Sequence, residues 1–216
     1  LMIDKTIQKI FQINKYDFFH TESTKSTMSD VKSFLTKNNR NCIYLSDKQS
    51  EGRGRRGNYW HSPPGNIYCS ISFDNFLNIK DHFLYSVLIC ITIKETLEKF
   101  NSSKIKFKWP NDIFYENKKF AGIVTETFNI KNLNPYMIAG FGINFISSPV
   151  IKNYESTYVK SFSTVKNIND FLEIFFKLLF INLKKIKKKD ITDLINDYSN
   201  SLMFINKIIK ISLPDN

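Results

Sequence analysis

Apolar and polar residues alternate in several stretches of the chain, which is the pattern of β-strands. The clearest is residues 66–73, where two faces separate: Ile67, Cys69, Ile71 and Phe73 on one, and Tyr68, Ser70 and Ser72 on the other. Similar patterns predict further strands at residues 42–45, 105–109, 113–115, 120–127 and 136–145, with a last one at 207–213.

Between these strands, apolar residues recur every three or four positions, which predicts helices. One begins near Thr27, and another runs from about residue 84 to 99; two more cover residues 171–183 and 191–202. Residues 50–65 contain so many turn-forming residues that we expect a loop. Antiparallel strands with helices grouped between them indicate an α+β fold.

Composition narrows the class of protein. A chain of 216 residues with 42% hydrophobic and 15% aromatic content suits one domain, with or without a small appendage, and is neither disordered nor collagen-like. No apolar run reaches the ~20 residues that span a bilayer, and no secretory signal is visible. The three cysteines lie in apolar surroundings without CxxC spacing, so we expect reduced core thiols in a cytoplasmic protein with no membrane partner.

Arginine and glycine are scarce and clustered. The formal net charge is +11, from 31 Lys and Arg against 20 Asp and Glu, yet only four residues are Arg. Three of these are Arg53, Arg55 and Arg56, and four of the seven glycines lie at positions 52–65. Arginine binds carboxylate and phosphate through a planar fork, and glycine lets the backbone approach a ligand closely. The loop is therefore a candidate anion-binding element.

The same loop formally matches a dinucleotide-binding pattern. Residues 52–57 read G-x-G-x-x-G and follow a predicted strand. That pattern requires a helix to begin at the third glycine. The sequence NYWHSPPG at 58–65 cannot form one, which excludes this interpretation.

Three motifs, in order, resemble the biotin protein ligase family. They are GRGRRGNYWHSPPGNIYCS at 52–70, KWPNDIFYENKKFAGIV at 108–124 and GFGIN at 140–144. Upstream, Ser23-Thr24 resembles the Ser-Thr-Asn element of the family, with Lys25 in place of its Asn. Asn58 replaces an Arg, and the segment before Asn66 is one residue shorter than usual. The resemblance covers roughly residues 20–200.

The resemblance implies the fold class: an α+β domain with a mixed or antiparallel central sheet flanked by helices, similar to class II aminoacyl-tRNA synthetases. It implies a catalytic domain at residues 1–201, with 202–216 as the start of a truncated or absent small β-barrel. Too few residues precede Ser23 for the N-terminal DNA-binding domain of some members, so we expect the short form.

The resemblance also implies the activity. Biotin and ATP would form biotinyl-5′-AMP, with Mg²⁺, and biotin would pass to a lysine of a biotin carboxyl carrier domain of an acyl-CoA carboxylase. Two residues are candidate catalytic groups: Lys119 and Arg55. Biotin would contact Ser23, Thr24, Lys25, Gln49, Arg53, Gly54, Arg55, Lys119 and Gly122. ATP would contact Arg53, Arg55, Trp60, Asn111, Asp112, Lys119 and Asn144, and Asp112 would also hold Mg²⁺.

Three alternatives remain open. A lipoate ligase would share fold and adenylation chemistry, although its arginine-glycine-glycine-glycine signature is missing. A nucleic-acid-binding module would use the net charge and the lysine-rich run at 184–189, which we interpret instead as the solvated end of a helix. A protein that only binds biotin would need no KWPND or GFGIN element. We expect no nucleic-acid partner, and either a monomer or a homodimer.

Overall fold

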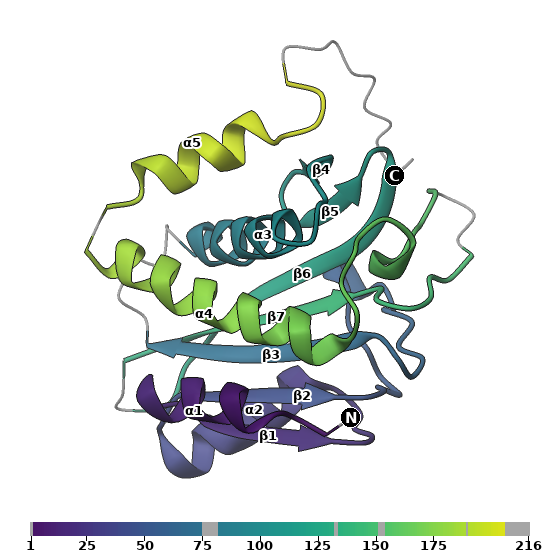
Figure 1. Cartoon of the computed structure of the whole chain (residues 1–216). Coiled ribbons are helices and arrows are strands. Elements are labelled where there is room, and N and C mark those ends of the chain that lie inside the picture. The colour runs from purple at the N-terminus through teal and green to yellow at the C-terminus, as the bar shows by residue number, and fades with distance from the viewer. Residues whose placement is uncertain (1, 75–81, 132–133, 151–153, 189, 206–216) are drawn as a thin grey trace, which may run out of the picture.

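A seven-stranded mixed sheet forms the centre of the molecule (Figure 1). The computed structural model describes residues 2–74, 82–131, 134–150, 154–188 and 190–205. The strand order is β1-β2-β3-β7-β6-β5-β4, with β1 parallel to β2 and the other neighbours antiparallel. The strands are β1 (Asp17–Thr21), β2 (Cys42–Ser46), β3 (Ile67–Asp74), β4 (Ile105–Lys108), β5 (Asp112–Tyr115), β6 (Lys118–Phe128) and β7 (Tyr136–Ile143).

Helices cover both faces of this sheet (Figure 1). On one face, α1 (Lys5–Ile13), α3 (Phe83–Glu98) and α4 (Ile168–Lys187) share the main hydrophobic core with the strands, and α5 (Thr192–Asn200) packs against α3. On the other face, α2 (Thr27–Asn38) packs through Met28, Val31 and Leu35 in a second, smaller core. Both faces of the central strands are therefore buried. The predicted α+β class is confirmed.

In the central strand β3, the alternation of apolar and polar residues corresponds to the two faces of the sheet. Its apolar residues face the main core, and its serines face α2. Ser70 and Ser72 are fully buried and hydrogen-bonded: Ser70 Oγ lies 2.7 Å from Thr27 Oγ1, and Ser72 Oγ accepts a hydrogen bond from Cys42 N at 2.8 Å. A buried hydroxyl needs such a partner. The alternation thus distinguishes an apolar core face from a polar buried face.

Most predicted elements are confirmed, with two differences. Helix α1 and strand β1 were not expected; α1 buries only Ile7 and Phe11, and β1 is a five-residue edge strand that depends on pairing with β2. Trp109 lies beyond β4 with its residue 69% exposed, so the predicted alternation ends at Lys108. The predicted strand at 207–213 lies outside the described residues.

The chain remains attached to the sheet past the predicted domain boundary. Phe107 N donates to Ser201 O at 2.8 Å, and Met203 N donates to Phe107 O at 2.7 Å. Residues 201–203 thus lie alongside β4. The division of the chain at 201 stays a prediction.

The three cysteine thiols lie in the interior of the protein. Cys42, Cys69 and Cys90 are buried and free, as expected, and burial raises the pKa of Cys42 to about 12.

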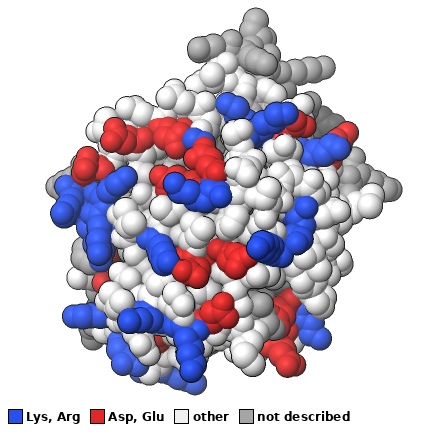
Figure 2. Space-filling model, in the orientation of Figure 1, with Lys and Arg blue, Asp and Glu red and all other residues white. Residues whose placement is uncertain are grey.

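On the face shown in Figure 2, acidic side chains separate the basic ones, so the described residues there form no continuous basic surface. Within the described part of the chain, no helix has the length and apolar character to cross a membrane.

Asn66, directly before β3, anchors the chain that leaves β7. Its Oδ1 accepts hydrogen bonds from the amides of Phe145, Ile146 and Ser147 at 2.8, 3.0 and 3.3 Å, and its Nδ2 donates to Ser147 O at 3.0 Å. The residue is 3% exposed. One side chain therefore replaces the strand pairing that ends at Ile143.

We expect Asn66→Ala to lower the free energy of unfolding by about 3 kcal/mol, because a buried amide N–H without an acceptor costs roughly 1–3 kcal/mol. Urea denaturation measures the change. Asn66→Asp keeps the acceptor oxygen, but it buries a charge and sets its second oxygen against Ser147 O, so it should also destabilise the fold. Equal stability of Asn66→Ala and the wild type would contradict this assignment.

Candidate active site

Two adjoining cavities open on the face of the sheet that α2 partly covers. The larger has a volume of about 880 Å³ and the smaller about 500 Å³. The larger is lined by the N-terminus of α2, by residues 52–60, which we call the glycine-arginine loop, and by strands β3, β6 and β7. Four residues line both cavities: Tyr59, Trp60, Lys119 and Tyr154. These four side chains form the boundary between two neighbouring compartments.

The floor of the larger cavity consists of small residues on adjacent strands. Ser70 pairs with Gly140, and Gly142 pairs with Gly122. A Cβ atom on Gly142 would lie 2.3 Å from Trp60 Nε1, and one on Gly122 would lie 3.0 Å from Trp60 Cζ3. The indole ring of Trp60 therefore rests directly on bare backbone. Its Nε1 is buried and makes no hydrogen bond to any described residue.

The glycine-arginine loop is a short hairpin that brings Trp60 to this position. Gly54 N donates to Asn58 O at 2.7 Å, and Trp60 N donates to Gly52 O at 2.9 Å. A Cβ atom on Gly52 would lie 2.3 Å from Trp60 O, so only glycine permits this approach. At the exposed tip, Arg55 Nη1 donates to Asn111 Oδ1 at 3.0 Å, which links the loop to the turn before β5.

A β-bulge turns the Lys119 side chain toward the cavities. Along β5 and β6, Ile113 pairs with Ala121 but Phe114 pairs with Lys119, so β6 has one extra residue, Phe120. Phe120 packs in the main core, and Lys119 lines both cavities. Without the extra residue, strict alternation would place Lys119 on the core face together with Ala121.

Lys119 is the most enclosed cation of the site. Its side chain is 12% exposed, and its Nζ lies 2.8 Å from Asp112 Oδ1. The same Nζ lies over two aromatic rings, 5.4 Å from the centroid of Trp60 and 5.1 Å from that of Tyr154. Among the described residues that line the larger cavity, Asp112 is the one acidic residue, against five basic ones: Arg53, Arg55, Arg56, Lys108 and Lys119. The cavity is therefore suited to an anionic ligand.

The opposite end of the larger cavity is neutral and polar. Gln49 Oε1 accepts hydrogen bonds from Thr27 N at 2.9 Å and from Thr27 Oγ1 at 3.2 Å, and Gln49 Nε2 donates to Ser62 Oγ at 3.2 Å. Thr27 Oγ1 also contacts Ser70 Oγ. These fixed donors and acceptors surround the first turn of α2. This end of the cavity can therefore exchange hydrogen bonds with a neutral polar group.

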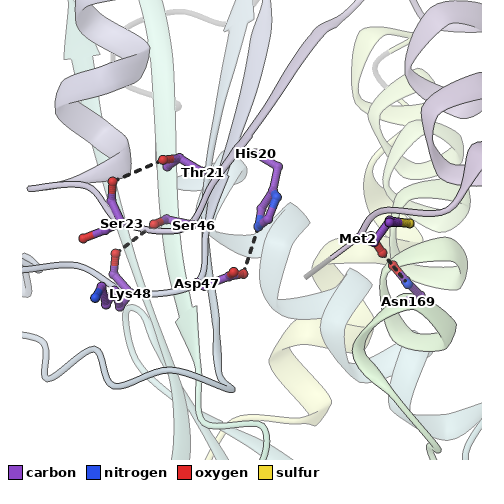
Figure 3. A network of polar contacts seen from close by, with 8 residues as sticks. All are labelled: Met2, His20, Thr21, Ser23, Ser46, Asp47, Lys48 and Asn169. Atoms are coloured by element: carbon purple, nitrogen blue, oxygen red, sulfur yellow. Dashed lines mark hydrogen bonds and ion pairs between the residues drawn. The ribbon is translucent and has the colours of Figure 1, made fainter.

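Ser23, Thr24 and Lys25, which the family resemblance assigns to biotin binding, do not line either cavity. Figure 3 shows Ser23 just after β1, where its carbonyl accepts the Thr21 hydroxyl at 3.2 Å. Thr24 Oγ1 donates to Asp30, and Lys25 pairs with Glu51 at the surface. The wall is instead formed by the next residues along: Ser26, Thr27 and Met28. The Ser-Thr pair occurs twice in this segment, and the pair that begins the helix lies in the cavity.

The other sequence-predicted residues do come together. The larger cavity is lined by Gln49, Arg53, Gly54, Arg55, Asn111, Asp112 and Gly122, together with the shared Trp60 and Lys119. Asn144 lines the smaller cavity and is 3% exposed, and its Nδ2 donates to Thr157 O at 3.1 Å. The cavities are also lined by Thr27, Met28 and Tyr154, which none of the sequence motifs assigns to the site. The predicted helix start at Thr27 was the available signal for the first two; no motif marks Tyr154.

Residues 20–144, more than half of the chain, match the family model described as the biotin/lipoate A/B protein ligase family. The chain belongs to this family. Among curated members, it is 35% identical over 101 residues to the bifunctional ligase/repressor BirA of Escherichia coli (strain K12). That match covers 46% of this chain and 32% of BirA, so the chain spans about a third of that relative's length.

Solved structures of the family share the fold. The biotin protein ligase from Leishmania major in complex with biotinyl-5-AMP superposes with a TM-score of 0.74 at 20% identity, over 93% of this chain and 86% of that one. The biotin protein ligase from Aquifex aeolicus in complex with biotin and ATP gives 0.72 at 22% identity, over 88% and 79%. The expected ligase catalytic fold is therefore confirmed.

Proposed function

We propose that this chain is an ATP-dependent biotin protein ligase. The observation that carries the proposal is the pair of cavities that meet at one largely enclosed ammonium group, that of Lys119. An enzyme that joins two anionic substrates needs such a junction, because the carboxylate and the phosphate repel each other until a cation lies between them. The solved relatives named above were obtained with biotin, ATP or biotinyl-5-AMP, which supports the same pair of substrates here.

Biotin would occupy the larger cavity. Its neutral ureido ring would meet Gln49 and Thr27 at the polar end, with Gly140 and Ser70 beneath the ring. Its carboxylate would then point toward Lys119 and the arginines of the loop. Ser26–Met28 replace Ser23, Thr24 and Lys25 in this assignment, because only the former line the cavity.

The adenine of ATP would occupy the smaller cavity, with Trp60 against the base and Asn144 at the wall. The phosphates would extend past Lys119 to Arg55, Arg53 and Asn111 in the larger cavity. Asp112 would supply one oxygen to Mg²⁺. The described residues contain no cluster of three potential metal ligands, so phosphate and water would complete the shell, as Mg²⁺ commonly requires. The ion would neutralise phosphate charge.

Two chemical steps follow. A biotin carboxylate oxygen attacks the α-phosphorus of ATP, the bond to the β-phosphate oxygen breaks, and pyrophosphate leaves. A lysine amine of a biotin carboxyl carrier domain then attacks the acyl carbon, loses a proton, and releases AMP. The ammonium of Lys119 would stabilise the charge that gathers on the phosphorus oxygens in the first step.

The test is incubation with ATP, Mg²⁺ and either biotin or lipoate. We expect pyrophosphate release with biotin, and a mass increase of one biotinyl group on an added carrier domain. A carrier domain whose acceptor lysine is replaced by arginine is the control and should keep its mass. Pyrophosphate release with lipoate but not with biotin would assign the chain to the other branch of its family and overturn the proposal.

A further inference from the structure

Residues 155–157 are hydrogen-bonded to the backbone at the start of β6. Lys119 N donates to Glu155 O at 2.9 Å, and Thr157 N donates to Lys119 O at 2.9 Å, so Lys119 forms a parallel bridge with Ser156. These two hydrogen bonds join the backbone of Lys119 to the segment directly after Tyr154. The Tyr154 side chain is therefore held at a defined distance from the lysine.

The Tyr154 ring lies against the Lys119 ammonium. The distance from Nζ to the ring centroid is 5.1 Å, within the ~6 Å range of cation–π attraction. Trp60 provides a second ring at 5.4 Å. With its side chain 12% exposed, Lys119 is largely removed from water, which strengthens both contacts.

These contacts hold the ammonium without satisfying its donors. An ammonium has three N–H donors, and among the described residues its one ion-pair partner is Asp112, whose Oδ1 lies 2.8 Å from Nζ. An aromatic face attracts the charge but does not replace an oxygen acceptor. Rings beside Lys119 therefore orient it while leaving donors for a ligand, which further carboxylates would not do.

Tyr154 is also suited to stay neutral. Burial, and after it the charge of Asp112, raise the pKa of its phenol above the usual value. A phenol is already uncharged at neutral pH, and this shift acts in the same direction, so its ring face remains the group that Lys119 meets. Because Tyr154 lines both cavities, the contact lies where the two compartments join.

We infer that Tyr154 is a positioning residue, which holds the Lys119 ammonium at the junction of the two cavities through its ring face. The kinetic part of this inference rests on the proposed function; the geometric part does not. The aromatic ring of Tyr154 makes this contact and its hydroxyl group does not. Tyr154→Phe should therefore preserve the position of the ammonium, and Tyr154→Leu should not.

The geometric part is tested by NMR on protein with ¹³C-labelled lysine, with the Lys119 signal assigned by its absence from a Lys119→Met variant. Ring currents should move the Cε–Hε signal of Lys119 upfield. We expect Tyr154→Leu to return it toward the position of an exposed lysine, and Tyr154→Phe to leave it upfield. An unchanged signal in Tyr154→Leu would overturn the inference, whatever reaction the protein catalyses.

The kinetic part is tested by pyrophosphate release with biotin and ATP. We expect Tyr154→Leu to lower kcat about 5- to 20-fold with smaller changes in KM, since a desolvated cation–π contact contributes roughly 1–2 kcal/mol. Tyr154→Phe should restore most of kcat. Tyr158→Leu, four residues away and outside both cavities, is the matched control and should behave as wild type.

A double-mutant cycle separates positioning from a general structural effect. If Tyr154 acts through the ammonium, Tyr154→Leu should have little further effect on kcat in a Lys119→Met background. Independent, multiplying effects would overturn the inference. A wild-type protein that releases no pyrophosphate would instead overturn the proposed function, and the NMR result would still decide the role of Tyr154.

Discussion

Lys119→Met should lower the rate of biotin-dependent pyrophosphate release by about 100- to 1,000-fold, the usual cost of one preorganised charge-stabilising donor. Methionine keeps the length and most of the apolar stem of lysine, so the packing against Trp60 and Tyr154 is largely retained. Only the ammonium is lost. Asp112 then loses its partner, but its side chain is 27% exposed and can be solvated, so the fold should persist.

The measurement is single-turnover pyrophosphate release, together with the thermal midpoint of each variant. Lys118→Met is the matched control: the same change one residue earlier, on a side chain that is 55% exposed and lines neither cavity. It should retain wild-type rates. Comparable rates for Lys119→Met and Lys118→Met would remove Lys119 from the chemistry.

Gly142→Ala should raise KM for ATP by about 5- to 150-fold, because base stacking on an aromatic side chain contributes roughly 1–3 kcal/mol. The added methyl group would lie 2.3 Å from Trp60 Nε1 and 2.5 Å from Trp60 Cε2, so the indole must leave the surface on which it rests. The register partner Gly122 lies under the same ring. The displaced ring could no longer form the wall of the adenine compartment.

Gly140→Ala is the matched variant, two residues earlier on the same face of β7. Its methyl group would meet Met28 Cγ at 2.8 Å and Ser70 Oγ at 3.1 Å, at the polar end of the larger cavity, and not Trp60. It should therefore raise KM for biotin more than KM for ATP. Steady-state kinetics with each substrate varied in turn distinguish the two. The opposite pattern would contradict the assignment of the compartments.

Local sequence patterns predicted most of the fold because the central elements carry clear periodicity. The alternation at 66–73 and the helical spacing at 84–99 correspond to β3 and α3. Strand β1 was missed because five residues at a sheet edge acquire their structure from pairing with β2, a contact between residues 25 positions apart, as in Asp17 with Cys42. The strand propensity of a few neighbouring residues carries no information about a contact between residues so far apart in the sequence.

The site was predictable to the extent that its residues lie in contiguous motifs. Arg55, Trp60, Asn111 and Lys119 were all identified and all line the cavities. The family resemblance assigns the Ser-Thr element to Ser23-Thr24, whereas the second Ser-Thr pair of this segment, Ser26-Thr27, lines the larger cavity. Only the packing of α2 on β3 brings Thr27 to Gln49 and Ser70.

The sequence by itself determined the family resemblance, the element pattern and the concentration of arginine and glycine in one loop, because these are properties of neighbouring residues. The tertiary structure decided the rest. A bulge of one residue turned Lys119 from the core to the cavities, glycines on two paired strands made room for Trp60, and a segment from beyond β7 brought Tyr154 to the lysine. Each of these depends on register between strands, which is set by hydrogen bonds between distant parts of the chain.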